Sequence, residues 1–157
     1  RYLAASASFD LAKPEISSFK AVKLNRPLKK NLNTKKKRMK VAINAYKKVM
    51  AYQVAEFTTA STYYIGDIYN HLAESLMESQ RPKGLSADEL EQYDILLEEQ
   101  AYPFEEKSID IHSSNIKRTE QGVYDEWIIK SMSILAKIQP VRYDKHEKLE
   151  PYVLITH

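Results

Sequence analysis

Apolar residues recur at steps of three, four and seven along most of the chain, which is the spacing of amphipathic α-helices. The first long stripe predicts one helix over residues 28–54, with a break at 33–34 as the alternative. The second stripe predicts a helix over residues 60–79, for which Thr58 and Thr59 are N-cap candidates. The two stripes consist of Leu28, Leu32, Met39, Ile43, Tyr46, Met50 and Phe57, and of Tyr64, Ile68, Leu72 and Leu76.

Prolines predict the boundaries in the first part of the chain. Pro14 is expected to divide the alanine-rich start into two short helices, at residues 2–12 and 14–25. Pro27 suits the first position of the long helix that follows, because that position needs no backbone N–H.

The middle of the chain carries a loop and a capping signal. Residues 81–85, RPKGL, are predicted to form a loop. Ser86 and Glu89 have the spacing of a capping box, in which each side chain accepts a hydrogen bond from the other residue's backbone N–H. Pro103 is expected to kink or restart the chain before a polar helix over residues 104–120. The apolar stripe of the helix that the box starts consists of Leu90, Tyr93, Leu97 and Ala101.

The last clear helix is predicted between Gly122, which marks a turn, and Pro140. Its stripe consists of Tyr124, Trp127, Ile128, Ser131, Ile134, Leu135 and Ile138. Trp127 is expected to pack in the hydrophobic core, so Trp127→Ala should destabilise the fold by several kcal/mol.

Successive helices with short connections predict an all-α fold of about six or seven helices over residues 1–140. A weak internal echo at a spacing of about 47 residues favours an α-solenoid of helical hairpins, with a closed bundle as the alternative. The remaining residues, 141–157, are interpreted as a tail in which 152–156 forms a strand or starts a further element. The echo pairs Tyr46 with Tyr93, Val49 with Leu96 and Phe57 with Phe104.

Composition excludes several kinds of chemistry. The chain of 157 residues has no cysteine, which rules out disulfides, thiolate catalysis and cysteine-based zinc sites. Its three glycines are too few for the phosphate loops of nucleotide-binding folds. No apolar run reaches the length of a membrane span, and the start at Arg1 indicates a piece of a longer protein.

The histidines and glutamates offer only weak catalytic or metal-binding patterns. His71 shares a predicted helix face with Glu74 and Glu78, but without a second histidine a solvated face is the favoured interpretation. His112 is interpreted in the same way. The glutamate pairs at 98–99 and 105–106 point in different directions on a helix and do not form a convergent acid–base pair. We therefore expect no enzyme activity, no metal and no cofactor.

One basic segment departs from the modest net charge of +3. The run TKKKRMK at residues 34–40 is flanked by Lys29, Lys30, Lys47 and Lys48. Its helical stripe favours a solvated basic face that docks an acidic partner or an adjacent repeat, with Lys36 and Lys37 as candidate contacts. A helical nucleic-acid-binding module that uses residues 29–48 is the alternative.

Residues 65–69, IGDIY, resemble the L-G-x-x-Y core of the first helix of a tetratricopeptide repeat, in which the small residue allows a paired helix to approach closely. The stretch from Asp88 to Pro103 resembles the second helix. Thr62 and Leu90 depart from the pattern, since the family prefers a large aromatic residue and alanine there. The resemblance implies a right-handed solenoid of elongated hairpins with a concave groove, which Tyr63, Asp67 and Asn70 could face.

Residues 27–143 are also similar to a region of large bacterial cell-envelope tetratricopeptide proteins, through segments that include 27–39, 54–69 and 78–107. This likeness implies a protein-interaction scaffold in the periplasm or cell envelope, with the cytoplasm as the alternative. The expected partner is a protein or peptide.

Overall fold

The computed structural model describes residues 1–140, and these residues form an all-α structure. The prediction of an all-α fold is confirmed, but the described residues contain five α-helices instead of six or seven. The predicted strand or element at 152–156 lies outside the described residues. The helices are α1 (Tyr2–Ala21), α2 (Leu28–Met50), α3 (Ala55–Met77), α4 (Ala87–Ile116) and α5 (Glu126–Ile138), and a short 3-10 helix, η1 (Lys117–Gln121), follows α4.

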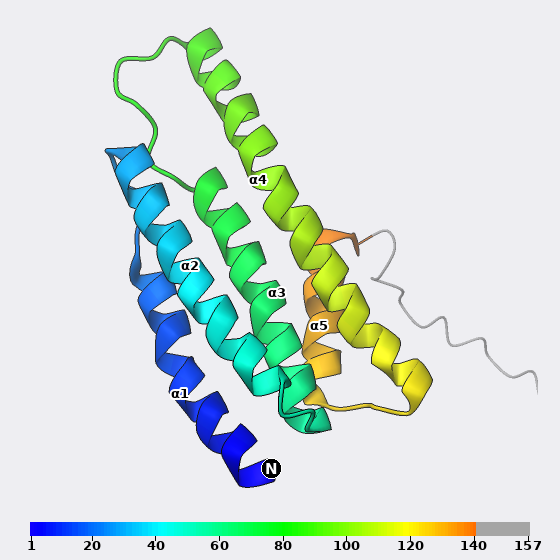
Figure 1. Ribbon diagram of the computed structural model, residues 1–157. Helices are drawn as coiled ribbons and strands as arrows, with labels where there is room; N and C mark the ends of the chain where they lie inside the picture. The colour runs from blue at the N-terminus through cyan, green and yellow to red at the C-terminus, as the bar shows by residue number, and fades with distance from the viewer. Residues whose placement is uncertain (141–157) are drawn as a thin grey trace, which may run out of the picture.

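Helix α3 occupies the centre of the molecule and contacts each of the other four α-helices. Successive helices run antiparallel and are joined by short connections, except for the longer loop between α3 and α4 (Figure 1). Helices α1 and α2 contact each other and lie on one side of α3, whereas α4 and α5 contact each other and lie on the other side. None of the helices in residues 1–140 combines the length and hydropathy needed to cross a membrane.

Aromatic side chains hold α1, α2 and α3 together. Phe9 of α1 lies 5.8 Å from Tyr46 of α2 and 5.6 Å from Phe57 of α3, measured between ring centroids. Trp127 of α5 joins this cluster through Tyr64, at 5.2 Å. These packed rings confirm that Trp127 takes part in the core, although its side chain is only half-buried.

Polar side chains hold α4 against α3 and α5. The Ser108 hydroxyl donates to the Gly66 carbonyl oxygen at 2.9 Å. The Asn115 amide donates to the Thr59 carbonyl oxygen at 3.1 Å and to Ser131 Oγ at 3.0 Å. Buried polar groups need such partners, so these hydrogen bonds allow the polar inner face of α4 to be buried against α3 and α5.

The two prolines that were expected to divide helices lie inside them. Pro14 is part of α1, and Pro103 is part of α4, so the predicted helices 2–12 and 14–25 are one helix and the restart at Pro103 is wrong. A proline in a helix interior costs about 3 kcal/mol. Burial on both sides of each proline offsets this cost, since the buried faces continue across them through Ala5, Phe9, Ala12, Ile16 and Phe19 in α1 and through Leu97, Ala101, Ser108, His112 and Asn115 in α4.

Other boundaries differ by up to about five residues, since α3 begins at Ala55 instead of residue 60 and therefore includes Phe57. Helix α2 runs unbroken through 33–34 and ends at Met50, and α4 gives way to η1 after Ile116. Thr58 and Thr59 lie inside α3 and are not its N-cap, because their hydroxyls bond to carbonyls of the preceding turn.

Three signals are confirmed. The Ser86 hydroxyl accepts from the Glu89 N–H, and the Glu89 carboxylate accepts from the Ser86 N–H. Gly122 follows η1 with a φ of 79°, the left-handed conformation that glycine adopts easily. The last helix ends at Ile138, before Pro140.

The 47-residue echo does not relate equivalent positions. Tyr46 lies near the end of α2, whereas Tyr93 lies near the start of α4. Phe57 lies in the first turn of α3, whereas Phe104 lies in the middle of α4.

Candidate functional site

A groove runs between α2 and α4, and α3 forms its floor. Ile43, Lys47 and Met50 line it from α2, while Ile65 and Tyr69 line it from α3. The α4 wall consists of Lys107, Ile111 and Ser114, together with Arg118 of η1. The groove exists because α2 and α4 both pack against α3 without closing over it.

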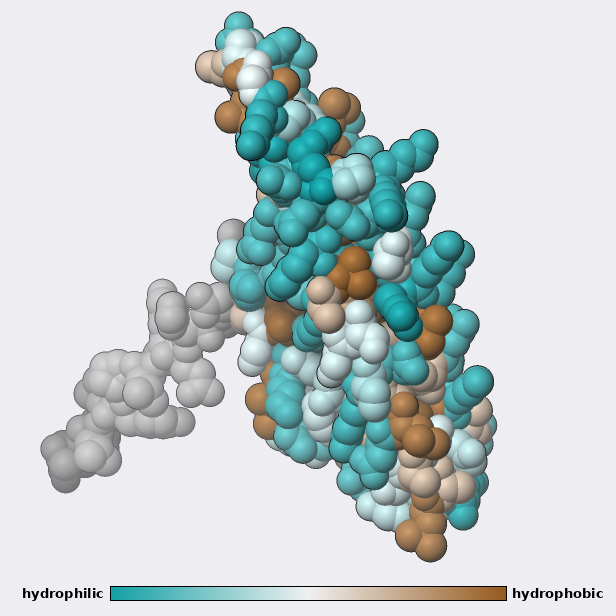
Figure 2. All heavy atoms as spheres, turned by 90° about the vertical axis from the view of Figure 1, so that its left-hand side faces the viewer, coloured by the Kyte–Doolittle hydropathy of each residue, from teal (hydrophilic) through white to brown (hydrophobic). Residues whose placement is uncertain are grey.

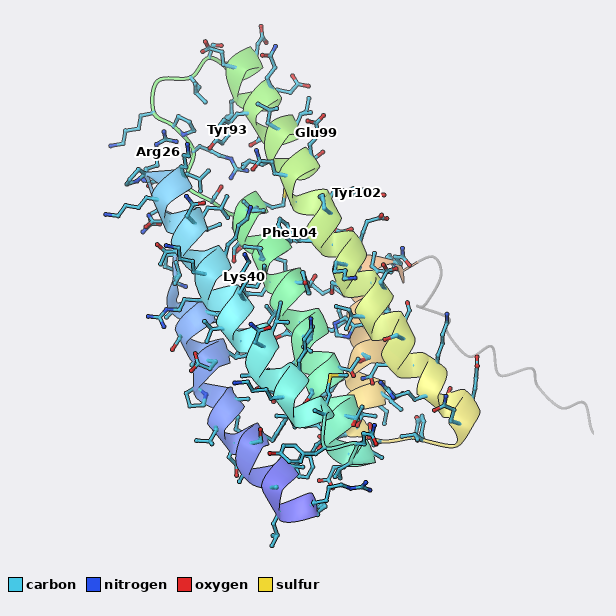
Figure 3. The ribbon with its side chains drawn as sticks, in the orientation of Figure 1. Arg26, Lys40, Tyr93, Glu99, Tyr102 and Phe104 are labelled. Atoms are coloured by element: carbon cyan, nitrogen blue, oxygen red, sulfur yellow. The ribbon has the colours of Figure 1, made fainter. Side chains whose placement is uncertain are left out.

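The groove continues towards the start of α2. This second stretch is lined by Met39 and Phe104 and by a group of polar residues on α2. Phe104 points from α4 towards α2, with Lys40 across from it, whereas Glu99 and Tyr102 lie on the opposite side of α4 (Figure 3). The Lys36 ammonium lies 5.4 Å from the centre of the Phe104 ring. The polar residues on α2 are Asn33, Lys36, Lys37 and Lys40.

The charge of the groove is positive. None of the 23 residues of α2 is acidic, and its lysines follow the groove. Lys36, Lys40 and Lys47 are four and seven residues apart, so they lie on one face of the helix. The two lined stretches contain basic and apolar side chains but no carboxylate. Figure 2 views the molecule from the side of α1 and α2, and a row of hydrophilic side chains projects along one edge.

Lys36 and Lys37, the sequence candidates on α2, both line the groove. Lys35, in the same run, is buried with 1% of its surface exposed. Its ammonium donates to the Val22 and Phe19 carbonyl oxygens at 2.8 and 3.2 Å, where it caps the end of α1. Burial and the charges of nearby lysines lower the pKa of Lys35 to about 8. The solvated-face interpretation is therefore wrong for Lys35. The spacing of Lys35 from Leu32 and Met39 would have placed it on the apolar stripe of the helix.

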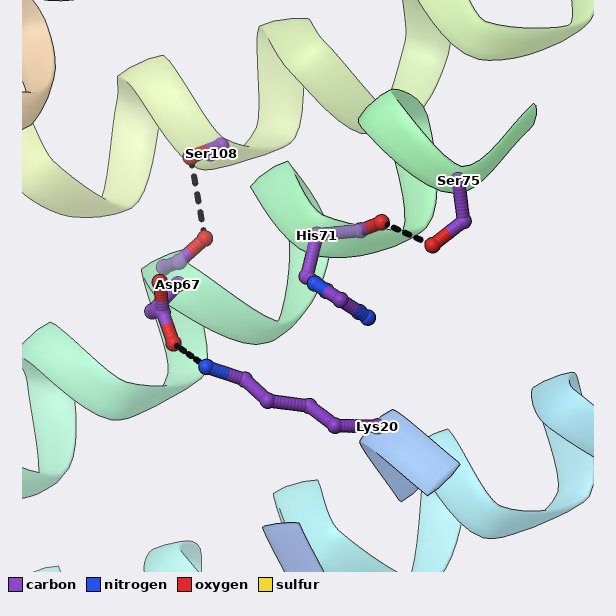
Figure 4. Close-up of polar contacts among 6 residues, drawn as sticks. Lys20, Asp67, His71, Ser75 and Ser108 are labelled. Atoms are coloured by element: carbon purple, nitrogen blue, oxygen red, sulfur yellow. Dashed lines mark hydrogen bonds and ion pairs between the residues drawn. The ribbon is translucent and has the colours of Figure 1, made fainter. Parts of the chain in front are cut away.

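Tyr63, Asp67 and Asn70 lie on the side of α3 that faces away from the groove. The Tyr63 ring packs against Trp127 of α5, at 5.6 Å. Asp67 accepts from the Lys20 ammonium of α1 at 2.8 Å (Figure 4). Asn70 is buried, with 7% of its surface exposed. The structure does not bring these three residues together with Lys36 and Lys37, and their role in binding stays a prediction.

The two histidines among the described residues, His71 and His112, are parts of helix packing. His112 is fully buried, and its Nδ1 lies 3.1 Å from Ser131 Oγ. Burial lowers the pKa of His112 to about 4, against the opposing charge of Asp67. His71 is partly buried, and its ring lies 5.4 Å from that of Phe19. Burial and the charges of Lys35 and Lys20 lower its pKa, while Asp67 and Glu74 oppose them.

The described part of the chain contains no group of three or more histidine, aspartate or glutamate side chains placed to hold a metal ion. Of the carboxylates near His71, Glu74 bonds to Lys137 of α5, at 2.9 Å. The interpretation of the histidines as solvated is wrong for His112, because tertiary contacts bury it.

No protein-family model matches the chain, and neither a curated protein nor a solved structure matches it.

Proposed function

We propose that this chain is a non-catalytic protein-interaction scaffold that receives a segment of a partner protein in the groove between α2 and α4. The observation that carries the proposal is the composition of the groove, with an apolar floor on α3 and a lysine-rich wall on α2. An apolar floor with a charged rim is the usual composition of a protein-binding surface.

We further propose that the helices form elongated, tetratricopeptide-like hairpins of a right-handed solenoid. Two features support this. Helix α3 contacts both α1 and α5, as successive first helices of stacked hairpins do, while α2 and α4 lie beside it. In addition, Gly66 allows α3 and α4 to approach closely, since a Cβ at this position would lie 2.6 Å from His112 Nε2. A location in the periplasm or cell envelope is proposed on the family likeness alone.

A second candidate function, nucleic-acid binding through residues 29–48, is favoured by the absence of acidic residues from α2. Phosphate binding would use the lysines and show a strong salt dependence. It would leave the apolar floor of the groove without a partner, and for this reason we prefer a protein ligand.

Photo-crosslinking from within the groove tests the proposal. Benzoylphenylalanine in place of Asn33, which is exposed at the end of the groove, should capture a protein in the cells that make this chain. The same substitution at Glu106, on the outer face of α4, is the control. The captured protein is then purified, and its binding to the chain is measured directly. Capture of nucleic acid alone, or equal capture from both positions, would contradict the proposal.

A further inference from the structure

We propose that the groove between α2 and α4 takes an acidic amphipathic helix. This inference rests on the proposed function and names the chemistry of the bound segment. It combines three features of the groove, namely cations without a carboxylate partner among the described residues, an apolar floor, and walls that offer no backbone hydrogen bonds.

The cations of the groove are not neutralised within residues 1–140. The ion pairs in this part of the chain involve other basic residues, namely Lys13, Lys20, Arg81, Lys130 and Lys137. The α2 wall of the groove carries Lys36, Lys40 and Lys47, and the opposite α4 wall carries Lys107. Among the described residues, no carboxylate lines the groove between these lysines. Carboxylates of a bound segment would relieve this repulsion, so charge complementarity selects an acidic ligand.

Arg118 adds a more specific feature at the end of the groove. Arg118 lines the groove and forms no ion pair with a carboxylate among the described residues. Its guanidinium can bind a carboxylate through two parallel hydrogen bonds, so we expect one acidic residue of the ligand at the Arg118 end.

The floor requires apolar side chains in the same ligand. Ile65 of α3 forms part of it and Ile43 of α2 borders it, and both are almost completely buried. Met50, Tyr69 and Ile111 are partly exposed beside them. A ligand that carried acidic groups alone would leave this surface in contact with water, so the bound segment must present an apolar face between its acidic edges.

The walls favour a helix over an extended peptide. Both walls and the floor are α-helices whose interior backbone groups bond within the helix. An extended ligand would therefore find no backbone partners, unlike a strand added to a sheet, whereas a helix satisfies its own backbone groups. The lined part of α2 extends from Asn33 to Met50, or about 25 Å at 1.5 Å per residue, which matches a ligand helix of about 17 residues.

The test measures binding of synthetic peptides to the whole chain by fluorescence anisotropy. The probe is a 17-residue helix-forming peptide with leucines on one face and glutamates along both edges. Peptides in which lysine replaces glutamate, or alanine replaces leucine, are the matched controls. We expect the acidic amphipathic peptide to bind and both controls to bind at least about tenfold more weakly, with affinity falling as salt is raised.

Two kinds of variant locate the binding. Lys36→Glu, Lys40→Glu and Lys47→Glu together should weaken binding about tenfold or more. The control variant, with Lys30→Glu, Arg38→Glu and Lys48→Glu, has the same net charge but changes exposed residues outside the groove. It should weaken binding by no more than about threefold, through long-range charge alone. Ser114→Trp fills the groove without changing its charge and should also abolish binding, and circular dichroism confirms that each variant is folded.

Several outcomes would overturn the inference. An equal loss of peptide affinity in the two charge variants would show diffuse electrostatic attraction instead of docking in the groove. Undiminished peptide binding to the Ser114→Trp variant would show the same. Tighter binding of a single-stranded DNA 20-mer through the same lysines would favour a nucleic-acid ligand. The first half of α4 is itself acidic and exposes Ile95 and Leu96, so a second copy of the chain could supply the bound helix. Sedimentation experiments would then show a dimer, and Ser114→Trp would abolish it.

The proposed function can survive when this inference fails. If the crosslink from position 33 captures a basic or neutral segment, the scaffold role stands and the acidic ligand is wrong. If no position on the chain captures a protein, the proposed function itself fails.

Discussion

The two sides of α3 are packed by different chemistry. Towards α1 and α2, its neighbours are large apolar and aromatic side chains, among them Phe9, Phe19 and Tyr46. Towards α4, they are mainly small or polar, and Ser108 and His112 lie against Gly66. One interface buries large side chains, whereas the other relies on close helix approach and hydrogen bonds.

This difference shows two ways of burying a helix. Apolar burial is non-directional, so the α1–α2–α3 interface should respond to lost side-chain volume. Hydrogen bonds and close contacts depend on geometry, so the α3–α4 interface should respond to added volume and to charge.

Truncation of an aromatic side chain on the apolar side should have the largest effect. Phe9→Ala removes a ring that contacts Tyr46, Phe57, Tyr64 and Trp127, and it should lower the free energy of unfolding by about 4 kcal/mol. Trp127 of α5 reaches the same aromatic cluster from the other side of α3, and Trp127→Ala, at a half-buried site, should cost about 3 kcal/mol. Urea denaturation measures both, and an unchanged midpoint in either variant would show that its ring adds nothing to the core.

Protonation should weaken the polar side. His112 has a pKa of about 4 in the folded chain and about 6.5 when unfolded, so between these pH values only the unfolded state binds the proton. Stability should therefore fall as the pH is lowered from 6.5 to 4, by up to about 3 kcal/mol. His112→Gln should flatten this part of the pH profile. A slope that the substitution leaves unchanged would assign the effect to other groups.

Added volume should also destabilise the polar side. Gly66→Ala would place a methyl group 2.6 Å from His112 Nε2, in a buried contact with little room to adjust. We expect a loss of about 2 kcal/mol, since overpacking outweighs the higher helix propensity of alanine. In a double-mutant cycle, Gly66→Ala should cost less in a His112→Ala background. Additive effects of the two substitutions would argue against a direct clash.

The smallest effect should come from the ion pair at the outer edge of α3. Lys20→Met removes the partner of Asp67, but the lysine is 41% exposed, so solvent screens the interaction. The expected loss is about 0.5 kcal/mol. Thermal unfolding at low and high salt measures it, and a difference that persists at high salt would mean that the pair is better shielded than its exposure indicates.

The fold class and several boundaries could be predicted from the sequence because they depend on local physics. Apolar spacing gives the helices, and the Ser86–Glu89 box and Gly122 act within a few residues of their position. Lys36 and Lys37 are candidates for the same reason, since charge along a helix is visible in the sequence. The groove that they line cannot be predicted from the sequence, because its walls come from helices far apart in the chain.

Residue order is enough to predict that this chain is helical and that one helix carries basic but no acidic residues. Packing between helices is needed to place Pro14 and Pro103 within helices, to bury Lys35 and His112, and to leave a groove over α3 between α2 and α4. These outcomes depend on long-range burial, whose free energy exceeds the local cost of a proline or a buried polar group only when the neighbouring helices are in place.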